Sequence, residues 1–563
     1  MYLFWTKNQT GNKYYCLGEN KKVNGKSVRV KEIYIGTADK LHELLYSKKD
    51  LDKINTYEYG LTVALLQEIS KCGLYKILKE VLPFKIRGVP ASIAVIILML
   101  NKIIDPKTKN SFSQWYRNSV ICKLLPINPD TLSSQFFFEL LRELDEKKIN
   151  RIEYRMAKNT KKIEMIDSIL CDMTHIETYI GYHKNNKLPQ RGRTRIKTGR
   201  RIVNLALLIT RNNSIPLFHI PYPGNINDVT EFTKIIRLLE KRFDFLTGHG
   251  KKKLTILIDK GNNSEDNLNG LEDVGYYFVG RLKPSDYPEL LAKPLSEFKD
   301  EYDDKEGVIS YSLFKKVYGK RRKLVVKYDK ESYEKSYGEF MDLIERRKQE
   351  IQELEDTINY KLKYGSKNSK TYWKKKEHVQ KAVKSVLNKN PTKYLFTYNL
   401  SHNEGRIDVE IEINQEEYDK RINLIGKYIL FTNRTRWTHN EIIKAFVDQY
   451  LIEDQYKKLK SERIKIEPPH HWTDASIRGD ISLSILSLRV MNLFLMKAKK
   501  KVELSNNEIL DTLENIRVSY YRLKEGKDEF DMVNEMDANE KQLYNKLKLK
   551  AGNTISYLKR AMA

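Results

Sequence analysis

The hydrophobic pattern changes character several times along the chain, and each change marks a predicted structural region. Residues 1–55 carry short apolar runs such as Val28 to Ile35 between turn signals, which predicts a small β-rich N-terminal region. Over residues 56–155 the apolar positions recur at helical spacing, as at Leu61 and Leu65. This stretch is predicted to be a helical domain that could bind DNA ends by docking a helix in a DNA major groove, although helical packing alone fits the pattern equally well.

Residues 156–282 alternate short β-type runs with helical ones. The predicted order is β-β-β-α-β-α-β, in which a helix begins at Asn227 or Asp228. A later strand ends on Asp259, and the helix after it is expected to begin near Ser264. The pattern indicates a mixed α/β sheet unit, which we predict to be the first part of a catalytic core.

Three further regions follow from composition and spacing. Residues 283–427 interrupt the alternation and are predicted to form an inserted β-rich domain with a helical hairpin. Residues 428–500 resume the core, with Thr438 expected to cap a helix over 440–461 and a largely apolar helix after it. Residues 501–563 are predicted to be a C-terminal helical region that supports dimerisation.

Composition and net charge limit the class of binding partner and the cellular compartment that we expect for this chain. The chain has 563 residues and a net charge of +28, which favours a polyanionic partner, above all nucleic acid. Its four cysteines form no C-x-x-C pair, which argues against a disulfide framework and a thiolate zinc site. The longest apolar run, Ala91 to Leu100, is too short to span a membrane, and no signal peptide precedes it. We therefore expect a cytoplasmic, nucleoid-associated bacterial protein.

Three carboxylates are candidates for catalytic chemistry. Asp172 lies inside an apolar strand, Asp259 ends a later strand, and Glu453 lies in the helix after the insertion. A carboxylate inside an apolar strand costs free energy unless another group compensates its charge. A divalent cation such as Mg²⁺ is the natural compensator for carboxylates that converge. The bland alternative for Glu453 is a surface carboxylate paired with Lys457.

The helix around Glu453 has a face that changes from apolar to polar. Steps of four and three residues place six side chains on that face: Ile442, Phe446, Gln449, Glu453, Tyr456 and Lys460. The apolar end is expected to pack on the sheet while Glu453 points at the metal region. Lys460, two turns further on, would hold a DNA phosphate beside it.

Four segments of the chain resemble the DDE transposases of bacterial insertion sequences. They are residues 171–184, 200–232, 254–268 and 450–472. The resemblance is to the subgroup with a tyrosine-arginine-glutamate-lysine signature, whose core carries a large β-rich insertion before the glutamate helix. It implies an α/β fold: a ribonuclease H-like mixed sheet interrupted by an α+β insertion domain, with helical N-terminal and C-terminal regions.

The resemblance also implies roles for individual residues. Asp172, Asp259 and Glu453 would be the catalytic and metal-binding triad, and Lys460 the lysine of the signature. Two Mg²⁺ ions, replaceable by Mn²⁺, would support cleavage at the element's ends and transfer of the 3′-OH ends to target DNA. The implied partners are the terminal inverted repeats, the target DNA and a second copy of the chain on DNA.

Two positions depart from the signature. Phe446 stands where the tyrosine is expected, and Gln449 where the arginine is expected. Their phosphate contacts are therefore lost or supplied by other residues. The run from Pro221 to Phe232 resembles the family's post-strand motif, with Pro223 and Gly224 in a tight turn and Asn225 and Asp228 leading into the helix. Its predicted role is capping and turn formation.

Basic segments fit a DNA partner. Eight basic residues occur without an acidic one in the loop between the first two core strands: Lys184, Lys187, Arg191, Arg193, Arg195, Lys197, Arg200 and Arg201. We predict that this loop contacts the DNA backbone, although a solvated loop has the same composition. A second cluster at Lys315 to Lys323 is flanked by acids and favours an ordinary solvated surface.

Other chemistry is less favoured by the sequence. His175, His470 and His471 lie near carboxylates or the glutamate helix, but packing or turn roles fit them better than zinc ligation. Trp373 and Trp437 could stack on a flipped base, although burial is the usual state of tryptophan. Two alternative functions stay open: a catalytically inactive DNA-binding relic or repressor, and a metal-dependent nuclease of the same fold.

Overall fold

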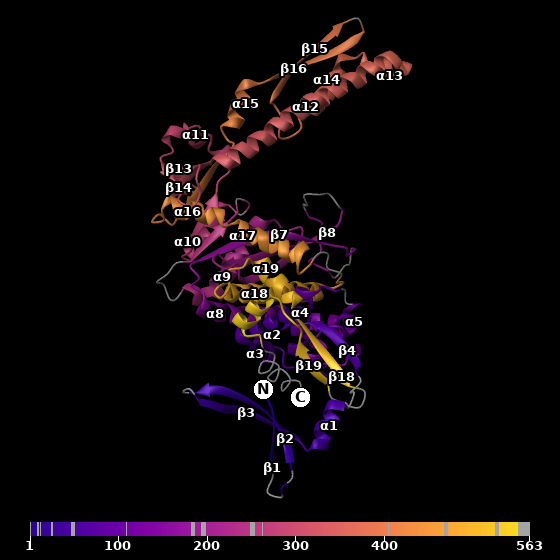
Figure 1. Cartoon of the computed structure of the whole chain (residues 1–563). Coiled ribbons are helices and arrows are strands. Elements are labelled where there is room, and N and C mark those ends of the chain that lie inside the picture. Colours follow the sequence, from indigo (N-terminus) through magenta and orange to yellow (C-terminus); the bar gives the residue numbers. More distant parts are fainter. Residues whose placement is uncertain are drawn as a thin grey trace. The chain divides into compact units, whose positions relative to one another are not determined.

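The computed structural model describes most of the chain and divides it into two compact units. The residues outside the description are 1, 8–10, 12, 24–25, 47–50, 108–109, 182–185, 193–198, 248–253, 260, 262, 404, 467–470, 524–528 and 550–563. The first unit joins Met1–Ala64, Gln114–Pro129 and Ala498–Lys559. The second contains Leu65–Ser113 and Asp130–Lys497. Figure 1 gives the position of each labelled element along the chain.

The first unit contains two small antiparallel sheets. One has the order β1-β2-β3, and the other has the order β19-β18-β4. The bounds are β1 (Tyr2–Lys7), β2 (Lys13–Val23), β3 (Lys26–Gly36), β4 (Leu51–Glu58), β18 (Arg517–Leu523) and β19 (Glu529–Val533). Two helices of the C-terminal region, α19 (Asn506–Asn515) and α20 (Ala538–Leu547), accompany the second sheet, and α1 (Ala38–Tyr46) follows β3.

The C-terminal region therefore differs from the prediction of an all-helical segment over 501–563. Residues 517–523 read Arg-Val-Ser-Tyr-Tyr-Arg-Leu, which is rich in residues that favour strands, and they pair along β4 from far upstream in the sequence. The predicted capping box is confirmed, because Ser505 and Glu508 exchange hydrogen bonds at the start of α19.

The second unit is built on a nine-stranded mixed sheet. Its strand order is β12-β13-β14-β17-β11-β10-β7-β8-β9. The bounds are β7 (Ser168–Thr178), β8 (Arg201–Thr210), β9 (Pro216–Pro223), β10 (Thr255–Ile258), β11 (Tyr277–Arg281), β12 (Asp300–Glu301), β13 (Val308–Val317), β14 (Lys320–Asp329) and β17 (Lys427–Thr432). Strand β10 runs parallel to β7 and β11, so all three end at the same edge.

The predicted order over residues 156–282 is confirmed. Three strands, β7 to β9, precede α9 (Asp228–Thr247), β10, α10 (Glu265–Asp273) and β11. The hydroxyl of Ser264 caps α10, as its position in the sequence predicts. Side chains of α9 and α10, among them Phe232 and Leu268, pack on the sheet in one apolar core with Ile256 and Phe278.

The predicted helical stretch over 56–155 is also present. It contains one short hairpin, whose strands β5 (Lys85–Ile86) and β6 (Val89–Pro90) have two residues each. Its helices are α2 (Gly60–Lys71), α3 (Leu74–Val81), α4 (Ala91–Ile104), α5 (Phe112–Arg117), α6 (Ile121–Leu124), α7 (Ser134–Glu143) and α8 (Glu146–Ile163). The apolar helix predicted after the glutamate helix is α18 (Asp474–Lys499). Among the described helices, α18 alone has the length and composition of a membrane span; 94% of its most apolar window is buried inside the protein.

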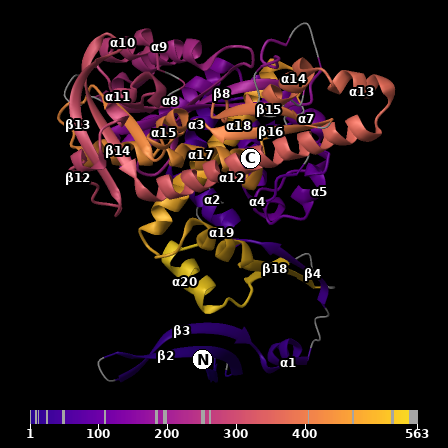
Figure 2. The ribbon, with the colours of Figure 1, turned by 90° about the horizontal axis from the view of Figure 1, so that it is seen from above.

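The predicted insertion over 283–427 divides into two structurally different parts. Strands β12, β13 and β14 belong to the main sheet, because β14 pairs with β17 and β17 pairs with β11. The remainder has an apolar core of its own, formed by residues such as Ile351, Val383 and Val409. Its elements are α12 (Lys330–Tyr364), α13 (Lys367–Trp373), α14 (Lys376–Leu387), β15 (Phe396–Asn403), β16 (Arg406–Ile413) and α15 (Gln415–Ile422). Figures 1 and 2 show α12 as one long helix with α13 at its far end.

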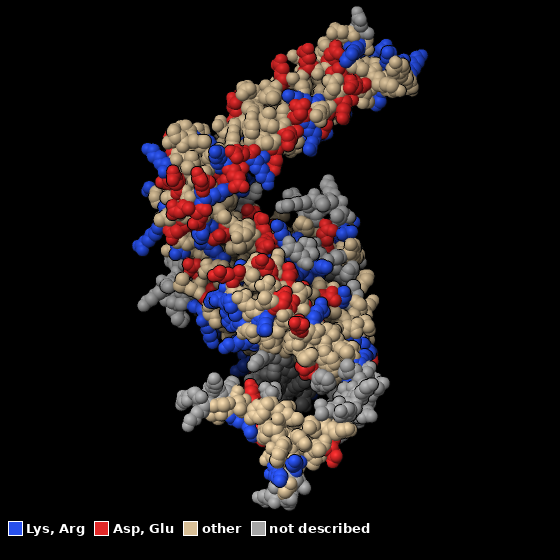
Figure 3. All heavy atoms as spheres, in the orientation of Figure 1, with Lys and Arg blue, Asp and Glu red and all other residues tan. Residues whose placement is uncertain are grey.

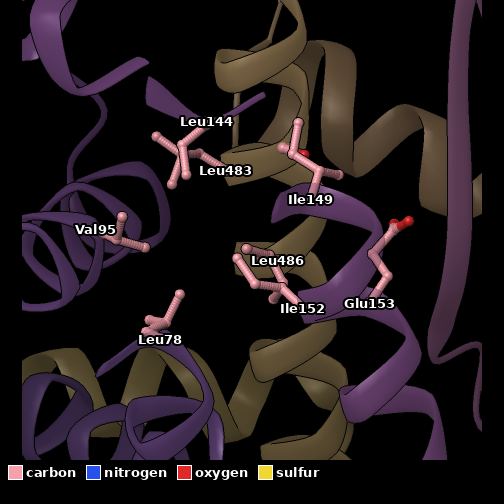
Figure 4. A pocket seen from close by; sticks show the side chains of 9 residues that line it. Leu78, Val95, Leu144, Ile149, Ile152, Glu153, Leu483 and Leu486 are labelled. Carbon is pink, nitrogen blue, oxygen red and sulfur yellow. The ribbon is translucent and has the colours of Figure 1, made fainter. Parts of the chain in front are cut away.

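A buried polar group lies where α8, β9 and α18 meet. His219 Nδ1 is 2.5 Å from Glu153 Oε1, and Ser482 Oγ is 3.3 Å from His219 Nε2. All three residues are buried, and the cavity beside them has a volume of only about 10 Å³. Figure 4 shows apolar side chains such as Leu78 around that cavity, with Glu153 directed away from it. The group therefore contributes to the core and has no room for a substrate.

Candidate carboxylate site

Two of the three predicted acids lie next to each other on neighbouring strands. Asp172 is in β7, and Asp259 is the residue after β10. The two strands are parallel and pair Cys171 with Ile258, so the next residues along, Asp172 and Asp259, are adjacent at the sheet edge. In α/β sheets ligands bind beyond the carboxyl ends of parallel strands, which is where Asp259 lies.

Glu453 reaches the same region from a helix, although this helix differs from the prediction. The continuous helix expected over 440–461 is divided into α16 (His439–Val447), α17 (Tyr450–Lys457) and a π-helical turn at Lys458–Glu462. The break falls at the turn residue Asp448, whose carboxylate accepts a hydrogen bond of 2.6 Å from Arg211 Nε. The predicted cap is confirmed, since Thr438 and Glu441 form a capping box.

Hydrogen bonds from the predicted helix face fix α16 and α17 on the sheet. Gln449 Nε2 donates to the carbonyl of Ile258 at 2.9 Å, and the Tyr456 hydroxyl donates to the carbonyl of Asp172 at 2.8 Å. The first contact is to the last residue of β10, which precedes Asp259, and the second is to Asp172 itself within β7. The predicted face of the helix is thereby confirmed as the one that meets the sheet, and Glu453 lies between these two contacts along the chain.

Lys460 lies beside the same strand. Its Nζ donates to Thr174 Oγ1 at 2.9 Å and to the carbonyl of His175 at 2.6 Å. Thr174 is two positions from Asp172, so the two side chains share one face of β7. The lysine is thus held near the acids, in the position from which it was expected to reach a phosphate.

The electrostatics show that the three acids act on one another. Burial, the largest cause, and the negative charges of Asp259, Glu453 and Asp228 together raise the pKa of the Asp172 carboxyl to about 7, against a lowering hydrogen bond from the Met173 N–H. Asp172 is half-buried, whereas Asp259 and Glu453 are exposed. The site is therefore an acidic cluster in which two of the three carboxylates lie at the surface.

Asp228 is a member of this cluster that the sequence reasoning assigned only to capping. It is the first residue of α9, and it accepts a hydrogen bond of 2.5 Å from the Tyr222 hydroxyl. Its charge acts on Asp172 through space. The Pro-Gly-Asn-Ile-Asn-Asp run of the sequence was the available signal, because it places an acid five residues after a strand end, at the start of a helix.

The donor set at this edge fits a divalent cation by its chemistry. Asp172, Asp259 and Glu453 supply hard carboxylate oxygens, and among the described residues none of the three forms an ion pair. Within the same described part of the chain, no three His, Cys, Asp or Glu side chains converge closely enough to hold a metal ion as they stand. A cation would relieve the repulsion that raises the pKa of Asp172.

The two departures from the signature have structural roles of their own. Gln449 ties α17 to the end of β10, as described above. Phe446 packs on Tyr428 with a ring distance of 5.8 Å, and the cations of Arg281 and Lys327 lie 5.9 and 5.4 Å from its ring. Arg281 ends β11, at the same edge as Asp259. Cations are therefore present around the position where the signature has its tyrosine.

The basic loop is described only in part. Lys184, Arg193, Arg195 and Lys197 lie outside the described residues. Lys187 and Arg191 are exposed, and the backbone N–H groups of Lys187 and Leu188 both donate to the Asp474 carboxylate. Arg200 pairs with Glu177 at 3.1 Å, and Arg201 donates to the carbonyl of Pro189.

Gly224 fixes the crossing of this loop over the end of β9. A Cβ at Gly224 would lie 2.2 Å from the carbonyl oxygen of Ile202, and the Gly224 N–H donates to the carbonyl of Leu188. Only glycine permits so close an approach. The predicted turn is confirmed as well, because the Ile226 N–H donates to the Pro223 carbonyl.

Three of the six cations in the second basic cluster pair with acids. Lys315 pairs with Glu289 at 2.9 Å, and Lys320 pairs with Glu272 at 2.7 Å. Arg322 is 1% exposed and pairs with the same Glu272 at 3.0 Å. The interpretation of this cluster as an ordinary protein surface is therefore favoured.

The tryptophans and histidines singled out in the sequence have packing roles where they are described. Trp437 is 7% exposed, and Trp373 packs against the core of the insertion. His471 is buried and pairs with Asp480 at 3.4 Å, whereas His470 lies outside the described residues. Two other tryptophans, which had not been selected from the sequence, are exposed: Trp472 is 69% exposed and Trp5 is 52% exposed.

The chain was compared with family models, curated proteins and solved structures. No family model and no curated protein matches the chain. A piggyBac transposase synaptic complex with hairpin DNA aligns over 84% of this chain and 74% of its own, with 10% identity and a TM-score of 0.36. A Mos1 transposase paired-end complex aligns over 34% and 58%, with 11% identity and a TM-score of 0.15. At these scores the likenesses establish neither the fold nor the function.

Proposed function

We propose that the chain is a DNA transposase of the DDE type with a ribonuclease H-like core. It would cleave the ends of its insertion sequence and join the 3′-OH ends to target DNA. The observation that carries the proposal is the placement of Asp172, Asp259 and Glu453 at one sheet edge, where burial and the charges of Asp259 and Glu453 raise the pKa of Asp172. Three acids distant in the sequence have no structural need to share that edge.

Asp172, Asp259 and Glu453 would hold two Mg²⁺ or Mn²⁺ ions. When bound, such ions supply activation of the attacking oxygen and charge stabilisation of the leaving 3′ oxygen. The protein's own residues would position the DNA: Lys460 would bind a phosphate beside Asp172, and Arg281, which lies beside Phe446 at the tyrosine position of the signature, would supply a second phosphate contact. Tyr456 and Gln449 keep the strand ends and the glutamate helix in register.

The DNA would lie along the basic loop. Lys184, Lys187, Arg191, Arg193, Arg195, Lys197, Arg200 and Arg201 supply cations for the phosphate backbone. Because Asp474 binds the backbone of the loop at Lys187 and Leu188, it would hold that part of the loop in place. Two DNA ends must be brought together for transposition, so we propose a homodimer on DNA in the bacterial cytoplasm.

The test uses the DNA that flanks the gene. The chain is incubated with that DNA and Mg²⁺ or Mn²⁺, and new 3′ ends and joined products are mapped for the unaltered chain and for Asp259→Ala. Asp454→Ala is the matched control, because Asp454 lies next to Glu453 on α17 but pairs with Lys458 at 2.7 Å. We expect cleavage and joining with the unaltered chain and the control, and neither with Asp259→Ala.

Other results would select the alternative functions. Cleavage that depends on Asp259 but never yields joined DNA would identify a nuclease of the same fold. Binding to the terminal repeats without any metal-dependent cut would identify a DNA-binding relic or repressor. Either result would contradict the proposed transposase.

A further inference from the structure

The outer end of the insertion concentrates lysines that no acid neutralises. Residues 360–384 cover the last turn of α12, all of α13 and most of α14, and we call them the lysine end. They contain nine lysines and one acid, Glu377. The lysines are Lys361, Lys363, Lys367, Lys370, Lys374, Lys375, Lys376, Lys381 and Lys384.

The rest of α12 has the opposite balance. Residues 331–356 contain nine acids and four basic residues. In Figure 3 the red acids follow the length of the insertion, and blue lysines gather at the end where α13 lies. Since α12 has 35 residues and rises about 1.5 Å per residue, the lysine end is about 50 Å along this helix from β14.

The lysines of this end differ from the other lysines of the insertion in their partners. Lys348, Lys389 and Lys420 pair with Glu345, Glu350 and Glu416 at 3.6, 2.7 and 2.7 Å. Within the described part of the chain, none of the nine lysines of the lysine end lies within ion-pair distance of a carboxylate. Seven of the nine are exposed. The positive charge of this surface is therefore uncompensated.

Exposed tyrosines are interspersed with these lysines. Tyr360, Tyr364 and Tyr372 are 65%, 64% and 46% exposed. The rings of Tyr360 and Tyr364 lie 5.1 Å apart, and Lys363 Nζ lies 5.2 Å from the ring of Tyr364. Tyrosine hydroxyls and lysine ammonium groups are both common donors to nucleic-acid phosphates.

The scaffold beneath this surface is well packed. Ile358, Val379 and Val383 are almost fully buried in the core of the insertion. Gly365 ends α12, and the hydroxyl of Ser366 caps α13 by accepting from the Ser369 N–H. The cations are thus presented by three helices on a common core instead of by an unstructured tail.

We infer that the lysine end is a second DNA-binding surface, which holds the phosphate backbone of double-stranded DNA without reading its sequence. The inference rests on the proposed function for the nature of the nucleic acid, and it adds a contact far along α12 from the carboxylate site. The charge run, its lack of acidic partners and its exposed donors are the features of backbone binding.

The test measures affinity of the full chain for random-sequence duplex DNA of about 40 base pairs over a range of salt concentrations. The variant is Lys374→Gln, Lys381→Gln and Lys384→Gln together. The control is Lys348→Gln, Lys389→Gln and Lys420→Gln, which makes the same change in net charge on the ion-paired part of the insertion. We expect the variant to bind about tenfold more weakly and to lose about 2–3 from the salt slope, since each phosphate contact contributes about 0.9.

The same three positions changed to arginine should keep the affinity, which separates a charge effect from misfolding. Equal affinity and slope for the variant and the control would overturn the inference. Loss of binding to a single-stranded RNA or to phosphatidylserine vesicles, with duplex binding unchanged, would overturn it too. If the unaltered chain cleaves DNA normally but the salt slope of the variant is unchanged, only the inference about the lysine end is refuted. If the salt slope of the variant is altered but the unaltered chain cleaves no DNA, only the proposed transposase function is refuted.

Discussion

The carboxylate site and the lysine end are two regions of one unit that gather like charges without their counter-charges. At the first, Asp172, Asp259 and Glu453 meet at a sheet edge, and burial together with mutual repulsion raises the pKa of Asp172 to about 7. At the second, nine lysines share the end of a helical insertion and are mostly exposed. Among the described residues, charges of the opposite sign are not paired with either group. We therefore expect a divalent cation at the carboxylate site and a polyanion at the lysine end.

The hairpin of β13 and β14 shows why composition alone does not identify such a region. Its sequence is as basic as that of the lysine end, but Glu272 and Glu289 neutralise Lys315, Lys320 and Arg322. Glu272 and Glu289 both lie outside the basic run, at earlier positions in the sequence. Only the structure separates a charge that is already paired from one that is available to a ligand.

The largest expected effect is on the rate of DNA cleavage. It tests whether the carboxylate site and the lysine end have separate functions. Asp172→Asn should lower the rate of DNA cleavage about ten-thousand-fold, because under the proposed function it removes a carboxylate that would hold the catalytic cations. Its affinity for duplex DNA should stay within about twofold, since the acid repels the backbone. Single-turnover cleavage and a binding titration measure the two effects. Comparable losses in both would contradict the separation of the regions.

The next largest effect tests the neutralised cluster. Arg322→Met should lower the free energy of unfolding by about 2–3 kcal/mol, because the Glu272 carboxylate loses its buried partner and keeps only Lys320. The backbone carbonyls of Val317 and Tyr318 also lose their donor. Denaturant unfolding followed by circular dichroism gives the value. Lys374→Met, at the lysine end, is the control and should change stability by less than about 0.5 kcal/mol.

A third prediction shows that a raised carboxyl pKa does not by itself mark a site. Burial raises the pKa of Glu58 to about 7, although its carboxylate accepts hydrogen bonds from the Leu61 N–H and the Thr62 hydroxyl. The folded state then favours the protonated acid, so stability is present below about pH 4.5 and is lost as the pH rises through 7. Glu58→Gln should remove this loss and stabilise the chain by roughly 2–3 kcal/mol at pH 8, with little effect at pH 4.

Unfolding free energies of both proteins at several pH values test this dependence. An equal effect of Glu58→Gln at pH 4 and pH 8 would show that the Glu58 carboxyl does not titrate in this range. Unlike Asp172, Glu58 lies next to its hydrogen-bond donors at the start of α2, so no cation is expected to bind there.

Local signals in the sequence predicted much of the second unit. The alternation of strands and helices over 156–282 and the caps at Ser264 and Thr438 are present, because each depends on a few neighbouring residues. Asp172 was selected since an acid in an apolar strand is costly. Glu453 was selected because of the helix face that it shares with Gln449, Tyr456 and Lys460.

What the sequence missed depends on pairing over long distances. β18 reads as part of a helical tail until β4 is placed beside it, and β14 reads as part of an inserted domain until it pairs with β17. The role of Asp228 depends on the tertiary position of Asp172. The lysine end was missed for a different reason: a run of lysines is usually a solvated surface, and its lack of acidic partners is visible only in three dimensions.

The smallest expected effect is on DNA affinity. It compares lysines that pair with a carboxylate with lysines of the lysine end, which do not. Lys315→Gln combined with Lys320→Gln should change the affinity for duplex DNA by less than about twofold, because each ammonium group already has a carboxylate partner. The same number of substitutions at the lysine end, Lys381→Gln with Lys384→Gln, should cost severalfold more and reduce the salt slope by about 2. Salt-dependent binding titrations of the two double variants give the comparison. If the two variants lose the same affinity, net charge alone governs binding, and the pairing of individual lysines does not decide which surface meets the DNA.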